Sequence, residues 1–310
     1  MTTIARNGTE VPLDIGCPFL TPRASPAQSV HDLRPDDIRV VAGIGDSVMA
    51  AFAAEGIQDN RFINIENLYE NRGVSFAMGG NPNTVTVPNI LNYYSHNLHG
   101  ASVGDHIISI CFGNQICPKG QYRSKIDRLN AAQSGARSLN LNHEIDYLLD
   151  ELDELYESGA VQRNDWKLLT FFIGSNDICH SCTEPTSLPN TFGINVLAAI
   201  ERIRTSIPYV LVQIVGLMRV HDIVVATSNF TDYCRPIKGS DFIGHDHECE
   251  CSHSEYNRTI MSTHFPEYNV ALKNVVENYQ TDQFLSDQTF GVVFQPLLVD
   301  IMSFPIQAIR

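Results

Sequence analysis

The 310-residue chain is 43% hydrophobic and carries 35 acidic against 21 basic side chains, giving a formal charge of -14. This composition suits one large folded domain and does not indicate disorder. The negative charge argues against nucleic acid and anionic bilayers as electrostatically attracted partners. The sequence has no run of 18 or more apolar residues and no signal-peptide core, so we expect neither a transmembrane segment nor an export signal within it.

The amino-terminal third predicts an irregular arm followed by a strand, a tight turn and a helix. Residues 1–36 are Pro-rich and are expected to wrap the domain as an arm, so that the domain itself spans 37–310. The following elements are expected to be a strand at 38–42, a helix at 47–55, a loop-rich excursion at 60–130 and a short helix at 88–98.

The remainder of the chain alternates between strand and helix patterns. Apolar residues recur with a 3.6-residue period from Leu141, which predicts an amphipathic helix ending at Gly159. The further elements are expected at 166–173 (strand), 196–207 (helix), 209–215 (strand), 268–279 (helix) and 291–294 (strand). This alternation predicts an α/β fold, a three-layer α/β/α sandwich with a parallel, flavodoxin-like sheet that binds ligands at the carboxyl ends of its strands.

Cysteines and glycosylation sequons both favour an exported protein. The chain has eight cysteines, with two close pairs at Cys179 and Cys182 and at Cys249 and Cys251. Sequons occur at Asn7, Asn229 and Asn257.

A zinc site is the alternative interpretation of the Cys/His segment at 241–253. That segment contains His245, His247, Cys249, Cys251 and His253. Alternation at every second residue does not match the usual spacing within a pair of zinc ligands. We therefore favour a disulfide-tied surface loop over a metal site.

Three residues stand where catalytic groups of a parallel sheet are expected. Ser47 follows the first strand at the start of a helix, where backbone N–H groups can stabilise an oxyanion. Gly135 lies in a small-residue loop, and Asn176 follows the second central strand. Each residue alone also fits an ordinary helix cap, loop or turn. Their common position at strand ends favours a catalytic serine with oxyanion donors.

The order of these three blocks resembles the GDSL (SGNH) hydrolase superfamily, and the closer resemblance is to the phospholipase B family. The matching segments are 29–47 (SVHDLRPDDIRVVAGIGDS), 71–80 (NRGVSFAMGG), 87–91 (VPNIL) and 173–182 (IGSNDICHSC). The resemblance implies hydrolysis of phospholipid and lysophospholipid esters without metal or cofactor, in an extracellular or membrane-associated protein. It also implies that Ser47 is the nucleophile, with its own backbone, Gly135 and Asn176 as oxyanion donors.

The resemblance extends to disulfides and leaves the catalytic base unassigned. Cys179 with Cys182, and the cysteines of the later Cys-rich loop, resemble that family's disulfides, with Cys234, Cys249 and Cys251 as candidates in the loop. The family's Asp-x-x-His follows the last strand, and we find no such motif after Asp300.

A C-terminally incomplete hydrolase domain of impaired activity is therefore expected. The one Asp-x-x-His, Asp177 to His180, overlaps the third block and is interpreted as coincidence, and His96, His99 and His264 have no motif support. A serine without its base retains only the contribution of the oxyanion hole and binding. A catalytically inactive lipid-binding protein and a truncated gene product are the alternatives.

Overall fold

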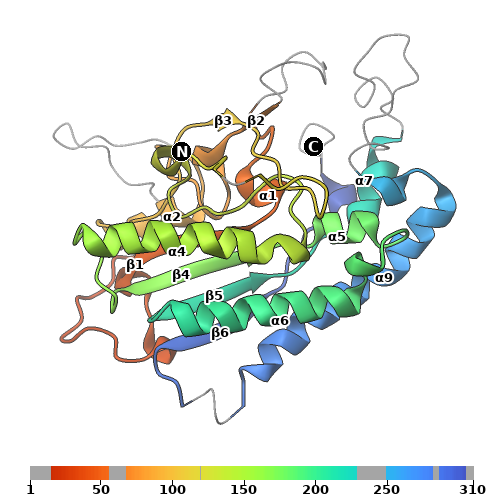
Figure 1. Cartoon of the computed structure of the whole chain (residues 1–310). Helices are drawn as coiled ribbons and strands as arrows, with labels where there is room; N and C mark the ends of the chain where they lie inside the picture. Colours follow the sequence, from red (N-terminus) through yellow and green to blue (C-terminus); the bar gives the residue numbers. More distant parts are fainter. Residues whose placement is uncertain (1–14, 56–67, 119, 229–248, 282–285, 305–310) are drawn as a thin grey trace.

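The main sheet has four parallel strands in the part of the chain that the structure describes. The computed structural model describes residues 15–55, 68–118, 120–228, 249–281 and 286–304. The strands lie in the order β1-β4-β5-β6 (Figure 1). Their bounds are Ile38–Gly45 (β1), Trp166–Phe172 (β4), Val210–Val215 (β5) and Phe290–Gln295 (β6). The predicted strands and their parallel pairing are confirmed.

Three long helices follow one another across one face of this sheet. They are α4 (Leu141–Glu157), α6 (Pro189–Ser206) and α9 (Glu255–Asn278). In Figure 1, α4 and α6 lie in front of the strands, and α6 packs against both α4 and α9. The strands step in one direction across the sheet, so right-handed crossovers place all their connecting helices on the same face.

The structure confirms the helix that the apolar stripe from Leu141 predicts. Leu141, Ile145, Leu148 and Leu152 are all buried against the sheet. Their spacing of three and four residues keeps them on one side of the helix.

The arm packs against the other face of the sheet at the amino ends of its strands. The Val30 backbone donates a hydrogen bond to the Gln288 carbonyl, and its side chain lies over Gly291. Ala27, Val30, Ile38 and Trp166 form a small core of their own. The described part of the arm is therefore tied to the sheet through apolar contacts.

The long excursion between β1 and α4 has little regular structure. It contains a two-stranded antiparallel pair, β2 (Tyr69–Glu70) and β3 (His106–Ile107), with short helices α2 (Val87–Asn92) and α3 (Ser124–Asp127). Its residues 129–133 run beside β1, because backbone hydrogen bonds join Gly43 and Gly45 to this segment. An irregular segment thus flanks β1 on the side away from β4.

Several helices differ from their predicted bounds. α1 covers only Ser47–Ala50, because Ala51 adopts a left-handed conformation with φ of 58°. Helix α9 begins at Glu255 and runs through Pro266, where the sequence predicted a start near 268. The sequence did not predict α5 (Ser175–His180) or α7 (Val220–Thr227). Within the described ranges, no helix is both long and apolar enough to cross a membrane.

Candidate active site

Ser47 lies at the carboxyl end of β1, as its position after the first strand predicts. It is the first residue of α1, and the Asp46 side chain caps that helix by accepting a hydrogen bond from the Val48 backbone at 3.0 Å. Gly45 is required before it, because a Cβ there would lie 2.3 Å from the Phe172 carbonyl oxygen. Ser47 is half-buried between the buried Asp46 and the exposed Val48. Its hydroxyl therefore sits at the surface of the sheet edge.

The loop that contains Gly135 is held beside Ser47 by the backbone of β1. The Gln133 N–H donates to the Gly45 carbonyl at 3.1 Å, two residues before the serine. Gly135 itself has φ of +84°, a conformation that L side chains rarely adopt. A Cβ there would also lie 2.8 Å from the Phe112 ring. Glycine is therefore the residue that fits this turn.

Asn176 completes the edge from the neighbouring strand β4. The Asp46 carboxyl group lies next to the backbone of Gly174 and Ser175, so the ends of β1 and β4 are in contact. The Asn176 side-chain Nδ2 donates a hydrogen bond to the Ala136 carbonyl at 3.0 Å, which ties it to the Gly135 loop. An amide NH₂ has two hydrogens, so one remains for another acceptor.

Two backbone donors at this edge are also available. Among the described residues, no hydrogen-bond acceptor is found for the N–H of Ser47 or of Gly135. Both residues are half-buried, as is Asn176, while most of their sequence neighbours are buried. The carboxyl edge of the sheet thus carries a serine hydroxyl and three N–H groups that can still donate, the kinds of groups that stabilise an oxyanion.

A buried ion pair supports the loop that contains Gly135, and no local sequence pattern indicates this role. The Arg72 guanidinium pairs with Glu70 at 2.7 Å and donates to the carbonyls of Asn130 and Ala132. Glu70 also accepts a hydrogen bond from the Ser134 hydroxyl at 2.6 Å. These fully buried charges satisfy loop carbonyls that would otherwise lack donors. Arg72 belongs to the segment that carries the family resemblance, but its contacts are long-range.

Three buried carboxyl groups lie around the candidate site. Burial raises the pKa of Asp46 to about 6. Burial also raises the pKa of Asp177 to about 7, although the Ser138 backbone and hydroxyl both donate to it. Glu144, which accepts a hydrogen bond from the Gly45 N–H at 2.9 Å, has a pKa well above its usual range because of burial and the nearby Asp46. Burial therefore favours the neutral form of each of these three carboxyl groups.

No described histidine is hydrogen-bonded to Ser47. The His180 Nδ1 instead contacts the Asn176 carbonyl at 2.7 Å, and its ring packs edge-on against Phe112. His99 pairs with Val40 near the amino end of β1, away from the serine. In the described ranges the Ser47 hydroxyl has no hydrogen-bond partner at all.

Comparison with known proteins assigns the chain to a family. The profile of the GDSL-like Lipase/Acylhydrolase family matches residues 41–306. The chain belongs to this family. It is also 31% identical over 293 residues to membrane-associated phospholipase B1 of Mus musculus, 30% identical over 208 residues to that of Rattus norvegicus, and 29% identical over 211 residues to that of Homo sapiens. These alignments cover 92%, 66% and 67% of the chain, but only 18%, 13% and 13% of the relatives.

The comparison confirms the predicted hydrolase class and the resemblance to phospholipase B. The chain spans less than a fifth of the length of these curated relatives. The GDSL hydrolase described here is therefore similar to one part of them.

The disulfides of this GDSL hydrolase correct the pairing that the resemblance implied. Cys179 pairs with Cys249, and Cys182 pairs with Cys251, so each bond joins two distant segments. Pairing within each close pair was wrong, because the start of α9 brings the later pair alongside α5. The structure adds a bond between Cys111 and Cys117, which the sequence did not predict. Cys234 lies outside the described residues.

Two of the candidate ligands for a zinc site in the Cys/His segment cannot bind a metal ion. Cys249 and Cys251 are both disulfide-bonded, so neither offers a thiolate. His245 and His247 lie outside the described residues. Of the sequons, Asn257 is half-buried in the first turn of α9, while Asn7 and Asn229 also lie outside.

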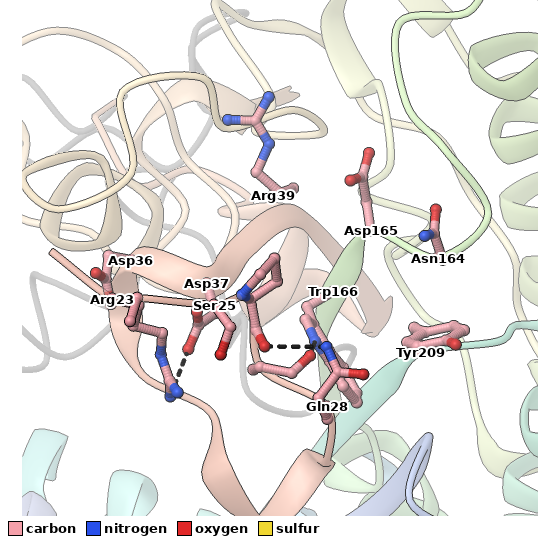
Figure 2. A pocket seen from close by; sticks show the side chains of 13 residues that line it. Arg23, Ser25, Gln28, Asp36, Asp37, Arg39, Asn164, Asp165, Trp166 and Tyr209 are labelled. Atoms are coloured by element: carbon pink, nitrogen blue, oxygen red, sulfur yellow. Dashed lines mark hydrogen bonds and ion pairs between the residues drawn. The ribbon is translucent and has the colours of Figure 1, made fainter.

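A hollow of about 620 Å³ lies at the opposite end of the sheet. It is lined by the arm and by the amino ends of β1, β4 and β5, including Arg39, Trp166 and Tyr209 (Figure 2). Two of its lining residues are joined by a hydrogen bond, which the Trp166 indole donates to the Ala27 carbonyl at 3.1 Å. The hollow is therefore separate from the edge that carries Ser47.

Proposed function

We propose that Ser47 is the nucleophile that cleaves acyl esters of phospholipids or lysophospholipids. The backbone N–H groups of Ser47 and Gly135 and the side-chain amide of Asn176 are the oxyanion donors in this proposal. The observation that supports the proposal is that the half-buried Ser47, the Gly135 loop and Asn176 all lie at the carboxyl edge of one parallel sheet. No metal or cofactor is needed for this chemistry.

The reaction proceeds through an acyl-enzyme. The Ser47 hydroxyl oxygen attacks the ester carbonyl and loses its proton, and the carbonyl oxygen becomes the oxyanion that the three donors bind. Collapse of this intermediate breaks the bond between the acyl carbon and the ester oxygen and leaves the acyl group on Ser47. The leaving oxygen takes up, through water, the proton that Ser47 lost, so the product is an alcohol: a lysophospholipid from a phospholipid, or a glycerophosphodiester from a lysophospholipid. Water then attacks the acyl ester and releases the fatty acid.

The proposed chemistry is slow when no base accepts the serine proton. The described histidines do not contact the Ser47 hydroxyl. A serine hydroxyl without a base is a weak nucleophile, and the oxyanion hole and binding alone give about 10³ to 10⁴ over water. We therefore propose that the 310-residue chain by itself is an impaired hydrolase.

The lipid substrate is proposed from the relatives and from the charge of the chain. The curated relatives are named as membrane-associated phospholipases. The net charge of -14 disfavours anionic lipid surfaces and suits zwitterionic headgroups. The three disulfides fit an extracellular or membrane-associated location, because such bonds persist in oxidising compartments.

Covalent capture by a fluorophosphonate tests the nucleophile directly. We expect the probe to label the wild-type chain slowly, on long incubation, and Ser47→Ala not at all, with the labelled peptide containing residue 47. Ser206→Ala, at the exposed end of α6, is the matched control and should be labelled like the wild type. Equal labelling of wild type and Ser47→Ala would remove Ser47 from the mechanism.

Turnover is then measured with lysophosphatidylcholine and a short-chain nitrophenyl ester. Slow hydrolysis that Ser47→Ala abolishes supports an impaired serine hydrolase. Binding of lysophosphatidylcholine with no turnover would instead support a catalytically inactive lipid-binding protein.

A further inference from the structure

A second cluster of polar side chains lies beyond the candidate active site, where α5 meets the start of α9. The side chains of His180, Glu184 and Glu250 each place one potential ligand atom within 4.8 Å of the others. His180 is the last residue of α5, Glu184 lies in the following turn, and Glu250 comes from the distant Cys-rich segment. The cluster is therefore assembled only by the tertiary structure.

One tautomer of the His180 imidazole is favoured, and it leaves Nε2 as the ring nitrogen able to bind a metal ion. Its Nδ1 lies 2.7 Å from the carbonyl oxygen of Asn176, which can only accept a hydrogen bond. The proton therefore resides on Nδ1, and Nε2 carries the lone pair. His180 is only 5% exposed, and among the described residues no hydrogen-bond donor approaches Nε2. A backbone carbonyl on the other ring nitrogen is the usual support of a metal-binding histidine.

The two glutamates supply oxygen ligands with little net repulsion. Glu184 is paired with the Arg137 guanidinium at 2.6 Å, and Glu250 accepts a hydrogen bond from the Thr183 hydroxyl at 3.0 Å. Two carboxylates and one guanidinium leave one net negative charge, which favours a divalent cation over an empty site. Within the described part of the chain, no donor is found for the second oxygen of either carboxylate, so each can coordinate a cation.

The two crossed disulfides fix the position of Glu250. Cys249 and Cys251 lie on either side of Glu250 in the sequence. Their partners lie next to His180, with Cys179 just before it and Cys182 two residues after it. The bonds thus hold the carboxylate against the end of α5 without help from the cluster itself. This preorganisation reduces the ordering cost of binding an ion.

We propose that His180, Glu184 and Glu250 bind one divalent cation of the zinc class. One imidazole nitrogen and two carboxylate oxygens give three protein ligands, and water completes a tetrahedral shell. The ion joins the carboxyl end of α5 to the Cys-rich segment. Through the His180 hydrogen bond it also rigidifies the backbone of Asn176.

Zinc binding by the whole, metal-stripped 310-residue chain tests the proposal. Equilibrium dialysis against Zn²⁺ with metal counting should give one ion per chain. We expect Glu250→Gln and His180→Gln each to weaken this binding at least tenfold. Glu267→Gln, an exposed carboxylate on α9, is the matched control and should bind like the wild type.

Three results overturn the proposal. The first is wild-type affinity in a folded Glu250→Gln variant. This change removes an exposed group, so the test does not depend on whether the protein tolerates a substitution at the buried His180. The second is loss of zinc only when His245 and His247 are replaced by Gln, which would assign the ion to those two histidines. Absence of zinc binding by the wild type would also refute the site.

Discussion

Removal of the crossed disulfides is expected to destabilise the protein in a strongly non-additive way. The Cys179–Cys249 and Cys182–Cys251 bonds span 70 and 69 residues. Closing a loop of this length in the unfolded chain is worth about 4 kcal/mol on the chain-entropy model. Once one bond is present, the second closes a ring of only a few residues and adds about 2 kcal/mol.

Removing either bond alone therefore costs about 2 kcal/mol, and removing both costs about 6 kcal/mol. Pairing within each close pair would close only very short loops, so removing all four cysteines would cost about 3 kcal/mol. Alanine variants of each cysteine pair and of all four cysteines are compared by urea unfolding at one pH. A fourfold variant that loses no more than the sum of the two single-bond variants would refute the crossed pairing.

The Cys111–Cys117 bond provides the control for this measurement. It closes a loop of 6 residues, so its removal is expected to cost about 2 kcal/mol. Because this loop shares no segment with the crossed bonds, its cost should add to theirs.

Three further changes test the candidate site. Asn176→Ala should lower kcat for ester hydrolysis by about 10² to 10³. The control is Asn195→Ala, which removes an amide that donates to Ser138 and should leave kcat near the wild-type value. An equal loss of kcat in the two variants would contradict an oxyanion role for Asn176. Gly135→Ala should lower the free energy of unfolding by at least about 1–2 kcal/mol, because its φ of +84° is unfavourable for alanine, and urea titration measures this. Asp177 has a pKa of about 7 when folded against an ordinary 3.8, so its contribution to stability is fully present below about pH 4 and is lost as the pH rises through 7. Asp177→Asn should flatten the fall in unfolding free energy between pH 4 and 8, and an unchanged slope would show that Asp177 titrates normally.

Much of the scaffold could be predicted because its signals are local. The apolar period from Leu141 specifies one buried helix face, and the run from Trp166 specifies a strand covered on both sides. Strand ends in a parallel sheet share one edge, so the chain order alone suggested that Ser47 and Asn176 would be neighbours. Helix ends were predicted less closely, because α1 ends at a left-handed Ala51 and α9 continues through Pro266.

The rest depended on contacts between residues far apart in the sequence. Which cysteine pairs with which is decided by how α9 starts beside α5, and spacing along the chain does not carry that information. The Arg72 support of the Gly135 loop and the gathering of His180 with Glu250 are likewise invisible to local patterns. The sequence by itself therefore determined the hydrolase class, the parallel sheet and the candidate nucleophile. Only the tertiary structure decided how distant charges, thiols and imidazoles meet, because burial and proximity are properties of the folded chain.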